Sequence, residues 1–258
     1  MAINNGVIAA QRLINEFGIE HPNDFTIEEL IHARDIILEE KKISNSDGRI
    51  VFGKSKTKIS INSQIKSIGR RRFTLAHELG HFELHHNLNT HLEDNALTLD
   101  YFKNGGQEYE ANQFATELLM PSKYFADYTH GKRFSPDLIR DIADHFKTSI
   151  TSATFRYLEL GQHPIFLFYC RDRKVVYWKN TYNYFRKVKD ITKLQPPTDS
   201  VAMEFFNNGT IYRKNESAQE IQKSTWFEIG ENESDDAYFE YAIVTKEYNT
   251  VLSVVWES

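Results

Sequence analysis

Apolar residues recur at helical spacing through the first forty residues of the chain. The pattern predicts one helix over residues 5–18 and a second that begins after a cap at Thr26 and runs to about Glu40. The period then changes to that of strands, and residues 49–53 and 58–62 are predicted to form a hairpin. An exposed hairpin edge could pair with an extended peptide, and a purely structural packing role is an equal alternative.

Helical spacing returns after the hairpin. Residues 68–86 are predicted to form a helix whose apolar side chains point in several directions, which is typical of a buried helix. Further helices are predicted over residues 108–120, 122–128 and 136–146, and from a cap at Ser149 or Thr151 to Gly161. The largely polar residues 87–106 are predicted to be a loop.

Short strand-like runs begin after His163 and change the character of the chain. Strands are predicted over residues 165–170, 174–178, 237–246 and 250–256, and a short helix over residues 217–223. We therefore expect an α+β protein with two domains. Residues 1–162 should be mainly helical with a small hairpin or sheet, and residues 163–258 should be a small α+β domain.

Composition limits the classes of protein that this chain can belong to. Its 258 residues have a formal charge of −5, which argues against a surface devoted to nucleic acid. The single cysteine, Cys170, excludes an intrachain disulfide. No stretch approaches the roughly 20 apolar residues of a membrane span, and the start does not resemble a signal peptide. We expect a cytoplasmic protein without membrane contact.

Two segments raise the question of nucleic-acid binding. Residues 41–72 contain ten Lys and Arg residues against one acidic residue, Asp47, and such a patch could bind phosphates or an acidic partner. Few aromatic residues interleave these charges, so a solvated surface is the interpretation that we favour. Residues 135–161 have helix-turn-helix proportions, but their second helix carries little positive charge beyond Arg156. We do not expect direct nucleic-acid binding.

The candidate chemistry lies in the predicted buried helix, which contains His77-Glu78-Leu79-Gly80-His81, an H-E-x-x-H motif. Residues four apart lie on one face of a helix, so His77 and His81 can offer two imidazole nitrogens to a single zinc ion. Glu78 then lies beside the metal, where it can take a proton from a water molecule that the metal activates.

A third protein ligand is usual in catalytic zinc sites. The extended motif H-E-x-x-H-x-x-G-x-x-H would place a histidine at position 87, which is Asn87. The remaining candidates are Glu108, Glu110, His85, His86 and His91. A glutamate from a neighbouring helix has the better geometry, because His85 lies a turn further along the axis than His81; these three histidines are expected to face solvent or to cap the helix. Asn112 lies one turn after Glu108 and could steady the site by a hydrogen bond.

Two motifs together resemble the ImmA/IrrE family of metallopeptidases. They are Arg-Phe-Thr-Leu-Ala-His-Glu-Leu-Gly-His at residues 72–81 and Glu-x-Glu-Ala-Asn-x-Phe-Ala-x-x-Leu-Leu-Met-Pro at residues 108–121. The resemblance covers about residues 5–161 and implies a helical, zincin-like metallopeptidase domain. It further implies that His77, His81 and Glu108 hold Zn²⁺ and that Glu78 is the general base, with Glu110 as the alternative ligand.

Members of this family include peptidases that cleave a helix-turn-helix transcriptional repressor at one site. The resemblance therefore implies a zinc-dependent endopeptidase with a repressor as its protein substrate. The alternative is a non-catalytic, zinc-containing regulator that binds or sequesters a repressor. Glu78 favours the enzyme, because a purely structural zinc site needs no carboxylate there. Residues 163–258 occupy the place of a sensor or partner-binding domain, without a specific match to one.

Overall fold

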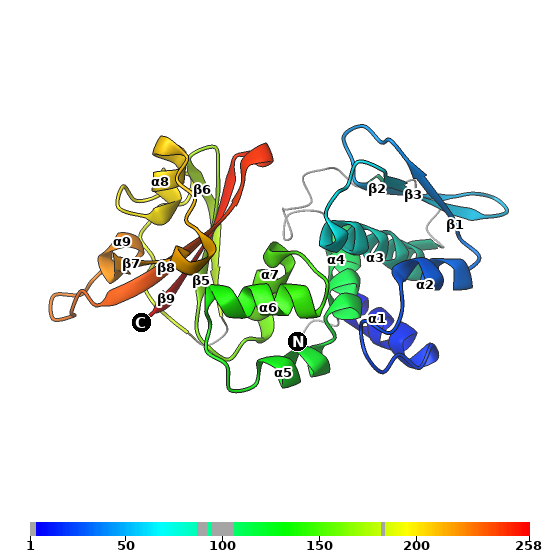
Figure 1. Ribbon diagram of the computed structural model, residues 1–258, viewed down its shortest axis with the longest axis horizontal. Helices are drawn as coiled ribbons and strands as arrows, with labels where there is room; N and C mark the ends of the chain where they lie inside the picture. Colours follow the sequence, from blue (N-terminus) through cyan, green and yellow to red (C-terminus); the bar gives the residue numbers. More distant parts are fainter. Residues whose placement is uncertain (1–3, 87–91, 94–105, 182–183) are drawn as a thin grey trace. The chain divides into compact units, whose positions relative to one another are not determined.

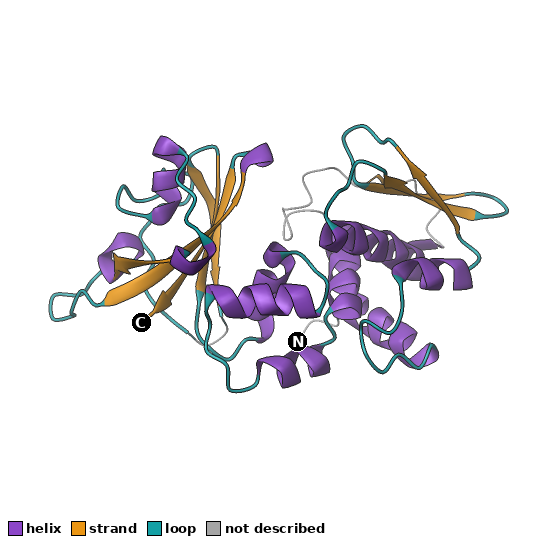
Figure 2. Cartoon of the chain, in the orientation of Figure 1, coloured by secondary structure: helices purple, strands orange, loops and turns teal. Residues whose placement is uncertain are grey.

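Helices and strands occur together in each of two parts of the chain (Figure 2). The computed structural model describes residues 4–86, 92–93, 106–181 and 184–258. One compact unit comprises Met1–Tyr128 and Ile142–Ser152, and the other comprises Thr129–Asp141 and Ala153–Ser258. Each unit has its own sheet, so the expected α+β class is confirmed. The domain boundary expected after residue 162 stays a prediction.

The first unit is built around α3 (Ile68–His85), the helix that carries the H-E-x-x-H motif. Its other elements are α1 (Asn5–Glu16), α2 (Ile27–Ala33), β1 (Ile37–Lys41), β2 (Gly48–Phe52), β3 (Thr57–Asn62), β4 (Leu92–Glu93), α4 (Gly106–Leu119) and most of α5 (Ser122–Thr129). The Ser67 side chain caps α3 by accepting a hydrogen bond from the Arg70 backbone N–H. The sheet covers one side of α3, while α4 and α1 pack elsewhere on it (Figure 1).

The strands of the first unit form a sheet in the order β1-β3-β2-β4. The predicted hairpin is confirmed as the antiparallel pair of β2 and β3, with Ile50 opposite Ile59. Both of its strands lie inside the described sheet, so neither is the exposed edge that was considered for peptide pairing. The predicted loop at residues 87–106 lies outside the described residues, apart from β4 and Gly106.

The helix predicted to reach Glu40 is wrong beyond Ala33. It does begin at Thr26, whose side chain forms a capping box with Glu29. Asp35 then adopts a left-handed φ of 54°, which ends the helical turn. The following residues form β1 and pair in parallel with β3. Spacing along the chain could not show this, because the partner strand lies after the β2 strand.

Gly80 allows α3 and α4 to approach closely. A Cβ atom added at Gly80 would lie 2.9 Å from Cδ1 of the buried Phe114 ring and 3.2 Å from the carbonyl oxygen of Ala111. Leu75, Leu79 and Leu118 belong to the same buried cluster as Phe114. This close contact brings the first turn of α4 towards the motif.

Arg72 fixes the start of α3 to distant backbone. Its guanidinium donates hydrogen bonds to the carbonyl oxygens of Phe146 (2.9 Å), Lys147 (3.2 Å) and Pro22 (3.3 Å). Three otherwise separate segments of the first unit are thereby held at one side chain.

The second unit is built on an antiparallel sheet in the order β6-β5-β9-β8-β7. Its strands are β5 (Phe166–Arg171), β6 (Lys174–Asn180), β7 (Ala218–Gln222), β8 (Ala237–Thr245) and β9 (Thr250–Glu257). The helix α8 (Val201–Asn208) packs on β8 and β9, and α9 (Lys223–Trp226) follows β7. The helices α6 (Pro136–His145) and α7 (Ile150–Leu160) contribute residues to both units.

The predicted strands of this unit are confirmed, but the helix predicted over residues 217–223 is wrong. That segment is β7, in which Ile221 is buried and lies opposite Tyr238 of β8. The helix α8 had no counterpart in the sequence-based prediction. In both cases the pattern is short, and the packing against the sheet decides the structure.

A buried carboxylate ties α8 to the sheet. Glu240 on β8 is fully buried and accepts four hydrogen bonds, from Val201 N, Ala202 N, Trp226 Nε1 and the Ser253 hydroxyl. Burial raises the pKa of the Glu240 carboxyl, and the four donors oppose that effect. The donors occupy both oxygens, so the site is complementary to a carboxylate.

We expect Gly80→Val to destabilise the first unit by about 1–3 kcal/mol, because the new methyl groups overlap Phe114 and Ala111. Helix propensity alone predicts a small gain, since valine is a better helix former than glycine. Far-ultraviolet circular dichroism during urea unfolding measures the change. Gly106→Ala is the control: no described atom lies within 4 Å of an added Cβ there. Equal stability of the Gly80→Val variant and the wild type would contradict the close packing.

We expect Glu240→Gln to lower the free energy of unfolding of the second unit by about 1–3 kcal/mol, because an amide NH2 must then face a backbone N–H donor. All three tryptophans, Trp178, Trp226 and Trp256, lie in this unit, so tryptophan fluorescence during denaturation reports on it alone. The control is Glu204→Gln, whose amide oxygen can still accept from Tyr212. A Glu240→Gln variant as stable as this control would show that the four donors matter little.

Candidate metal centre

Two histidines of α3 and one glutamate of α4 converge in the first unit. The Nε2 atoms of His77 and His81 lie 3.0 Å apart, and both side chains are almost fully buried. Glu108, in the first turn of α4, places Oε2 3.2 Å from His77 Nε2 and Oε1 3.3 Å from His81 Nε2. One ligand atom from each of the three residues lies within 4.8 Å of the others, which is a group that could hold a metal ion.

The other nitrogen of each ring has a partner that orients it. His77 Nδ1 lies 2.9 Å from Asn112 Oδ1. Asn112 was expected to steady the site by a hydrogen bond of this kind. His81 Nδ1 lies 3.1 Å from His85 Nδ1. Both Nε2 atoms are therefore turned towards Glu108, as in metal sites where the remote ring nitrogen is held by a hydrogen bond.

Burial sets the protonation of the group. It is the largest influence on His81 and lowers its pKa to about 4, so the ring is neutral at pH 7. Burial acts to raise the pKa of the Glu108 carboxyl, but its contacts with His77 and His81 outweigh burial and hold that pKa below its usual value. A neutral imidazole and a carboxylate are the forms in which these groups bind metals.

The residues fit a metal ion. Atoms of two imidazoles and a carboxylate that face one another at 3.0–3.3 Å need a positive charge between them, either a ring proton or a metal. Burial works against a second ring proton on His81, as its low pKa shows, so only one of its two nitrogens carries a hydrogen. Two histidine nitrogens and a glutamate oxygen form a donor set of catalytic zinc sites, and ligand atoms around a tetrahedral zinc ion lie about 3.3 Å apart.

Glu78 lies at the junction of α3 and β2. It is buried, and Gly48 at the start of β2 packs against it: an added Cβ would come within 2.7 Å of Glu78 Oε1 and 2.6 Å of Thr74 Cγ2. The absence of a side chain at Gly48 lets the β2 backbone approach the carboxylate that was predicted to act as general base.

Glu110, the alternative ligand, is placed differently from Glu108. Its Oε2 lies 3.1 Å from His85 Nε2, and its Oε1 accepts a hydrogen bond of 2.7 Å from Asn5 Nδ2 of α1. The structure thus brings Glu108, and not Glu110, to the paired Nε2 atoms.

The expectation that His85 faces solvent is wrong. Its side chain is 3 % exposed and lies between His81 and Glu110. The sequence contained the signal, because residues 77, 81 and 85 repeat at four-residue spacing on one helix face. His86 is exposed and contacts the Phe82 carbonyl at the helix end, and His91 lies outside the described residues.

Residues 32–157 match the sequence profile of the IrrE N-terminal-like domain, peptidase family M78. This part of the chain belongs to the ImmA/IrrE family. The resemblance inferred from the two motifs is thereby confirmed, and the family indicates a metallopeptidase-like role for the IrrE-like domain.

Solved structures support the fold. A chain described as a Mycobacterium tuberculosis transcriptional regulator superposes with a TM-score of 0.56 at 14 % identity, over 99 % of this chain and 77 % of that one. None of the curated proteins compared matches the sequence. Among the described residues, no helix combines the length and apolar character needed to cross a bilayer.

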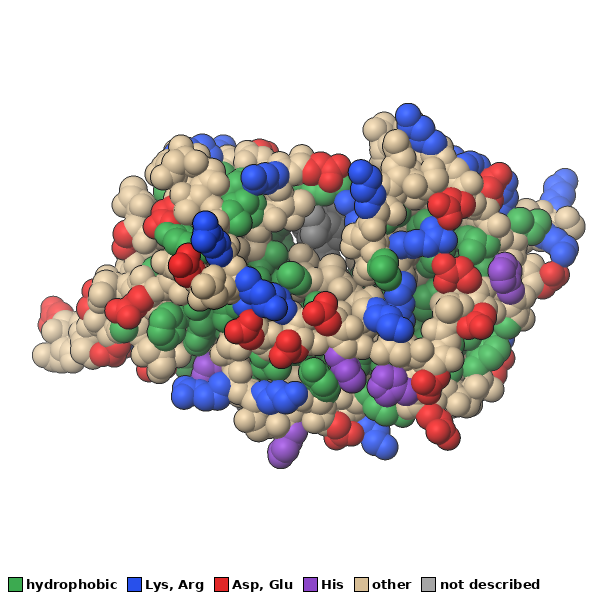
Figure 3. All heavy atoms as spheres, in the orientation of Figure 1, with side chains coloured by type: hydrophobic (Ala, Val, Ile, Leu, Met, Phe, Trp, Pro, Cys, Tyr) green, Lys and Arg blue, Asp and Glu red, His purple; other side chains and the backbone are tan. Residues whose placement is uncertain are grey.

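Five of the ten basic residues in the segment 41–72 pair with acidic neighbours. Arg70 pairs with Asp47, Arg71 with Glu28 and Glu40, Lys56 with Asp35, and Lys41 and Lys58 with Glu39. Blue and red side chains lie intermixed on the face of the molecule in Figure 3. Arg156, in the segment with helix-turn-helix proportions, is buried and pairs with Glu159. These contacts favour the solvated surface over a nucleic-acid site.

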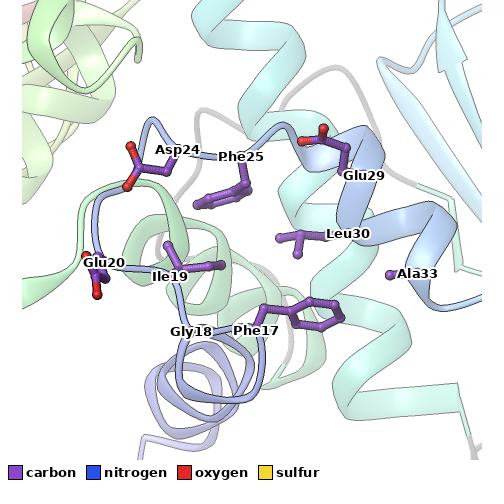
Figure 4. Close-up of a pocket in the computed structure, with 9 residues that line it drawn as sticks. All are labelled: Phe17, Gly18, Ile19, Glu20, Asp24, Phe25, Glu29, Leu30 and Ala33. Carbon is purple, nitrogen blue, oxygen red and sulfur yellow. The ribbon is translucent and has the colours of Figure 1, made fainter.

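A surface hollow of about 500 Å³ lies between α2 and the segment that follows α1 (Figure 4). Its lining mixes the apolar side chains Phe17, Ile19, Phe25 and Leu30 with the acidic residues Glu20, Asp24 and Glu29. None of the three candidate ligands lines it, so the hollow is not part of the candidate site.

We expect Zn²⁺ to raise the Tm of the chelator-treated protein, because a ligand that binds only the folded state at 100 times its Kd adds about 2.7 kcal/mol of stability. Glu108→Gln should abolish this rise, since one of the three ligands is weakened. His86→Gln, at the residue that follows α3 and lies outside the group, should retain it. A similar rise in all three proteins would place the metal elsewhere.

Proposed function

We propose that the protein is a zinc-dependent endopeptidase. His77, His81 and Glu108 would hold Zn²⁺, and Glu78 would be the catalytic general base. The observation that carries the proposal is the convergence of three ligand atoms within 4.8 Å in an IrrE-like domain, with Glu78 directly following the first ligand.

The division of roles follows from the chemistry of the groups. When bound, the zinc ion polarises the scissile carbonyl and lowers the pKa of water. Glu78 takes the proton of the attacking water and passes it to the leaving amine nitrogen. The packing of α3 against Gly48 confines the Glu78 carboxylate, so little freedom must be lost when it acts. Asn112 holds the His77 ring by its Nδ1 atom.

For the substrate we propose a helix-turn-helix transcriptional repressor, cleaved at one site. Two findings support this choice: the family resemblance, and the similarity in fold to a chain described as a transcriptional regulator. The competing function is that of a non-catalytic, zinc-containing protein that sequesters the repressor. The two differ in whether Glu78 must exchange a proton.

We expect Glu78→Gln to retain zinc and to slow cleavage of a repressor encoded beside this gene by about 10²- to 10⁴-fold, the usual contribution of a general base. Mass spectrometry of the incubated repressor measures the cleavage, and metal analysis measures the zinc content. The matched control is Glu83→Gln, a substitution on the same helix at a residue that pairs with Arg34.

A repressor-controlled reporter separates the two functions. Peptidase action requires that Glu78→Gln leaves the reporter repressed. Full relief of repression by a zinc-loaded Glu78→Gln variant would show that the protein acts by binding.

A further inference from the structure

A chain of three contacts leads from α1 to the candidate ligand His81. Asn5 Nδ2 lies 2.7 Å from Glu110 Oε1, and Glu110 Oε2 lies 3.1 Å from His85 Nε2. His85 Nδ1 lies 3.1 Å from His81 Nδ1. Neither Glu110 nor His85 belongs to the group of three candidate ligands.

The chemistry of these groups decides which atom donates and which accepts in each contact. A carboxylate can only accept hydrogen bonds, so the proton between Glu110 and His85 lies on His85 Nε2. A neutral imidazole then has an acceptor at its other nitrogen, so His85 Nδ1 accepts a proton from His81 Nδ1. The Nε2 of His81 consequently carries a lone pair, and this is the atom that faces His77 and Glu108.

The first of these contacts, between Asn5 and Glu110, is fixed by packing. Gly6 of α1 lies against α4, where an added Cβ would come within 2.2 Å of the carbonyl oxygen of Glu110. This approach brings Asn5, the first residue of α1, onto the Glu110 carboxylate. Because the Asn5 amide group donates, it reserves one carboxylate oxygen and leaves the other for His85.

We propose that Glu110 and His85 are positioning residues that hold His81 in the tautomer whose Nε2 binds the metal. This Glu110–His85–His81 relay rests on the metal site proposed above. It assigns to Glu110 a role through His81 rather than direct coordination.

The test is Glu110→Gln, which keeps the shape of the side chain but supplies a donor. Asn5 donates to the amide oxygen, so the amide NH2 turns to His85 and opposes the proton on its Nε2. We expect a Zn²⁺ Kd about 10- to 100-fold higher, the usual cost of losing a group that orients a ligand. Competition with a chromophoric chelator measures the Kd on the full chain.

The rescue variant is Asn5→Asp combined with Glu110→Gln. An aspartate at position 5 accepts from the amide NH2, which returns the amide oxygen to His85 and restores the original direction. We expect the zinc affinity to return to within about threefold of the wild type. Glu117→Gln is the matched control, because Glu117 lies on the same helix and contacts Ser122 and Gln11.

The Glu110→Ala variant distinguishes the relay from a simple loss of negative charge. Glu110 has a side-chain exposure of 28 %, so water can replace it and accept from His85. The relay predicts that Glu110→Gln binds zinc more weakly than Glu110→Ala, whereas a charge effect makes the two equal. Imidazole ¹⁵N shifts of the metal-free protein report the tautomer of His81 directly and should change in Glu110→Gln alone.

Unchanged zinc affinity in Glu110→Gln, or no recovery in the double variant, would overturn the relay. A Zn²⁺ Kd raised by more than about 1,000-fold in both Glu110→Gln and Glu110→Ala would also overturn it, because such a loss indicates a direct ligand. Each of these leaves the proposed peptidase intact. A wild-type chain that binds no zinc overturns both proposals, and a zinc-loaded Glu78→Gln variant that still cleaves overturns the peptidase mechanism alone.

Discussion

The contact between α3 and α4 is the constraint on which the candidate site depends. One helix supplies His77 and His81 and the other supplies Glu108, so neither helix contains the site alone. The distance between the helices is set at Gly80, where the Phe114 ring and the backbone of α4 take the place of a side chain. The small sheet acts on the opposite side, where Gly48 brings β2 against Glu78. The candidate ligands and the proposed general base are therefore positioned by two close backbone approaches, one on each side of α3.

Much of this arrangement was predictable from the sequence, because it depends on local spacing. The repeat of His77 and His81 places two candidate ligands on one face of a helix, and the second motif carries Glu108. The wrong secondary-structure predictions have a common physical cause. Residues 37–41 and 218–222 became strands because of partners elsewhere in the chain, which no local period shows. His85 is a different case, because its four-residue spacing from His81 is visible in the sequence, and only its partner Glu110 comes from another helix.

In both units, acidic side chains are matched by groups from several elements. In the second unit Glu240 joins β8 to α8, α9 and β9 through four donors. In the first unit Glu108 and Glu110 stand on the same turn of α4 but meet different partners, one the paired Nε2 atoms and the other His85 and Asn5. Of these three carboxylates only Glu240 is fully buried, and there an unmatched polar group would cost about 1–3 kcal/mol.

Arg72 shows how tolerance to mutation is distributed around the site. Its guanidinium binds three backbone carbonyls, at Pro22, Phe146 and Lys147, and it contacts none of their side chains through these bonds. These hydrogen bonds therefore do not depend on the identity of the side chains at those three positions. No other side chain has the length and the number of donors to replace the arginine. Loss of this anchor by substitution is therefore concentrated at one position, Arg72.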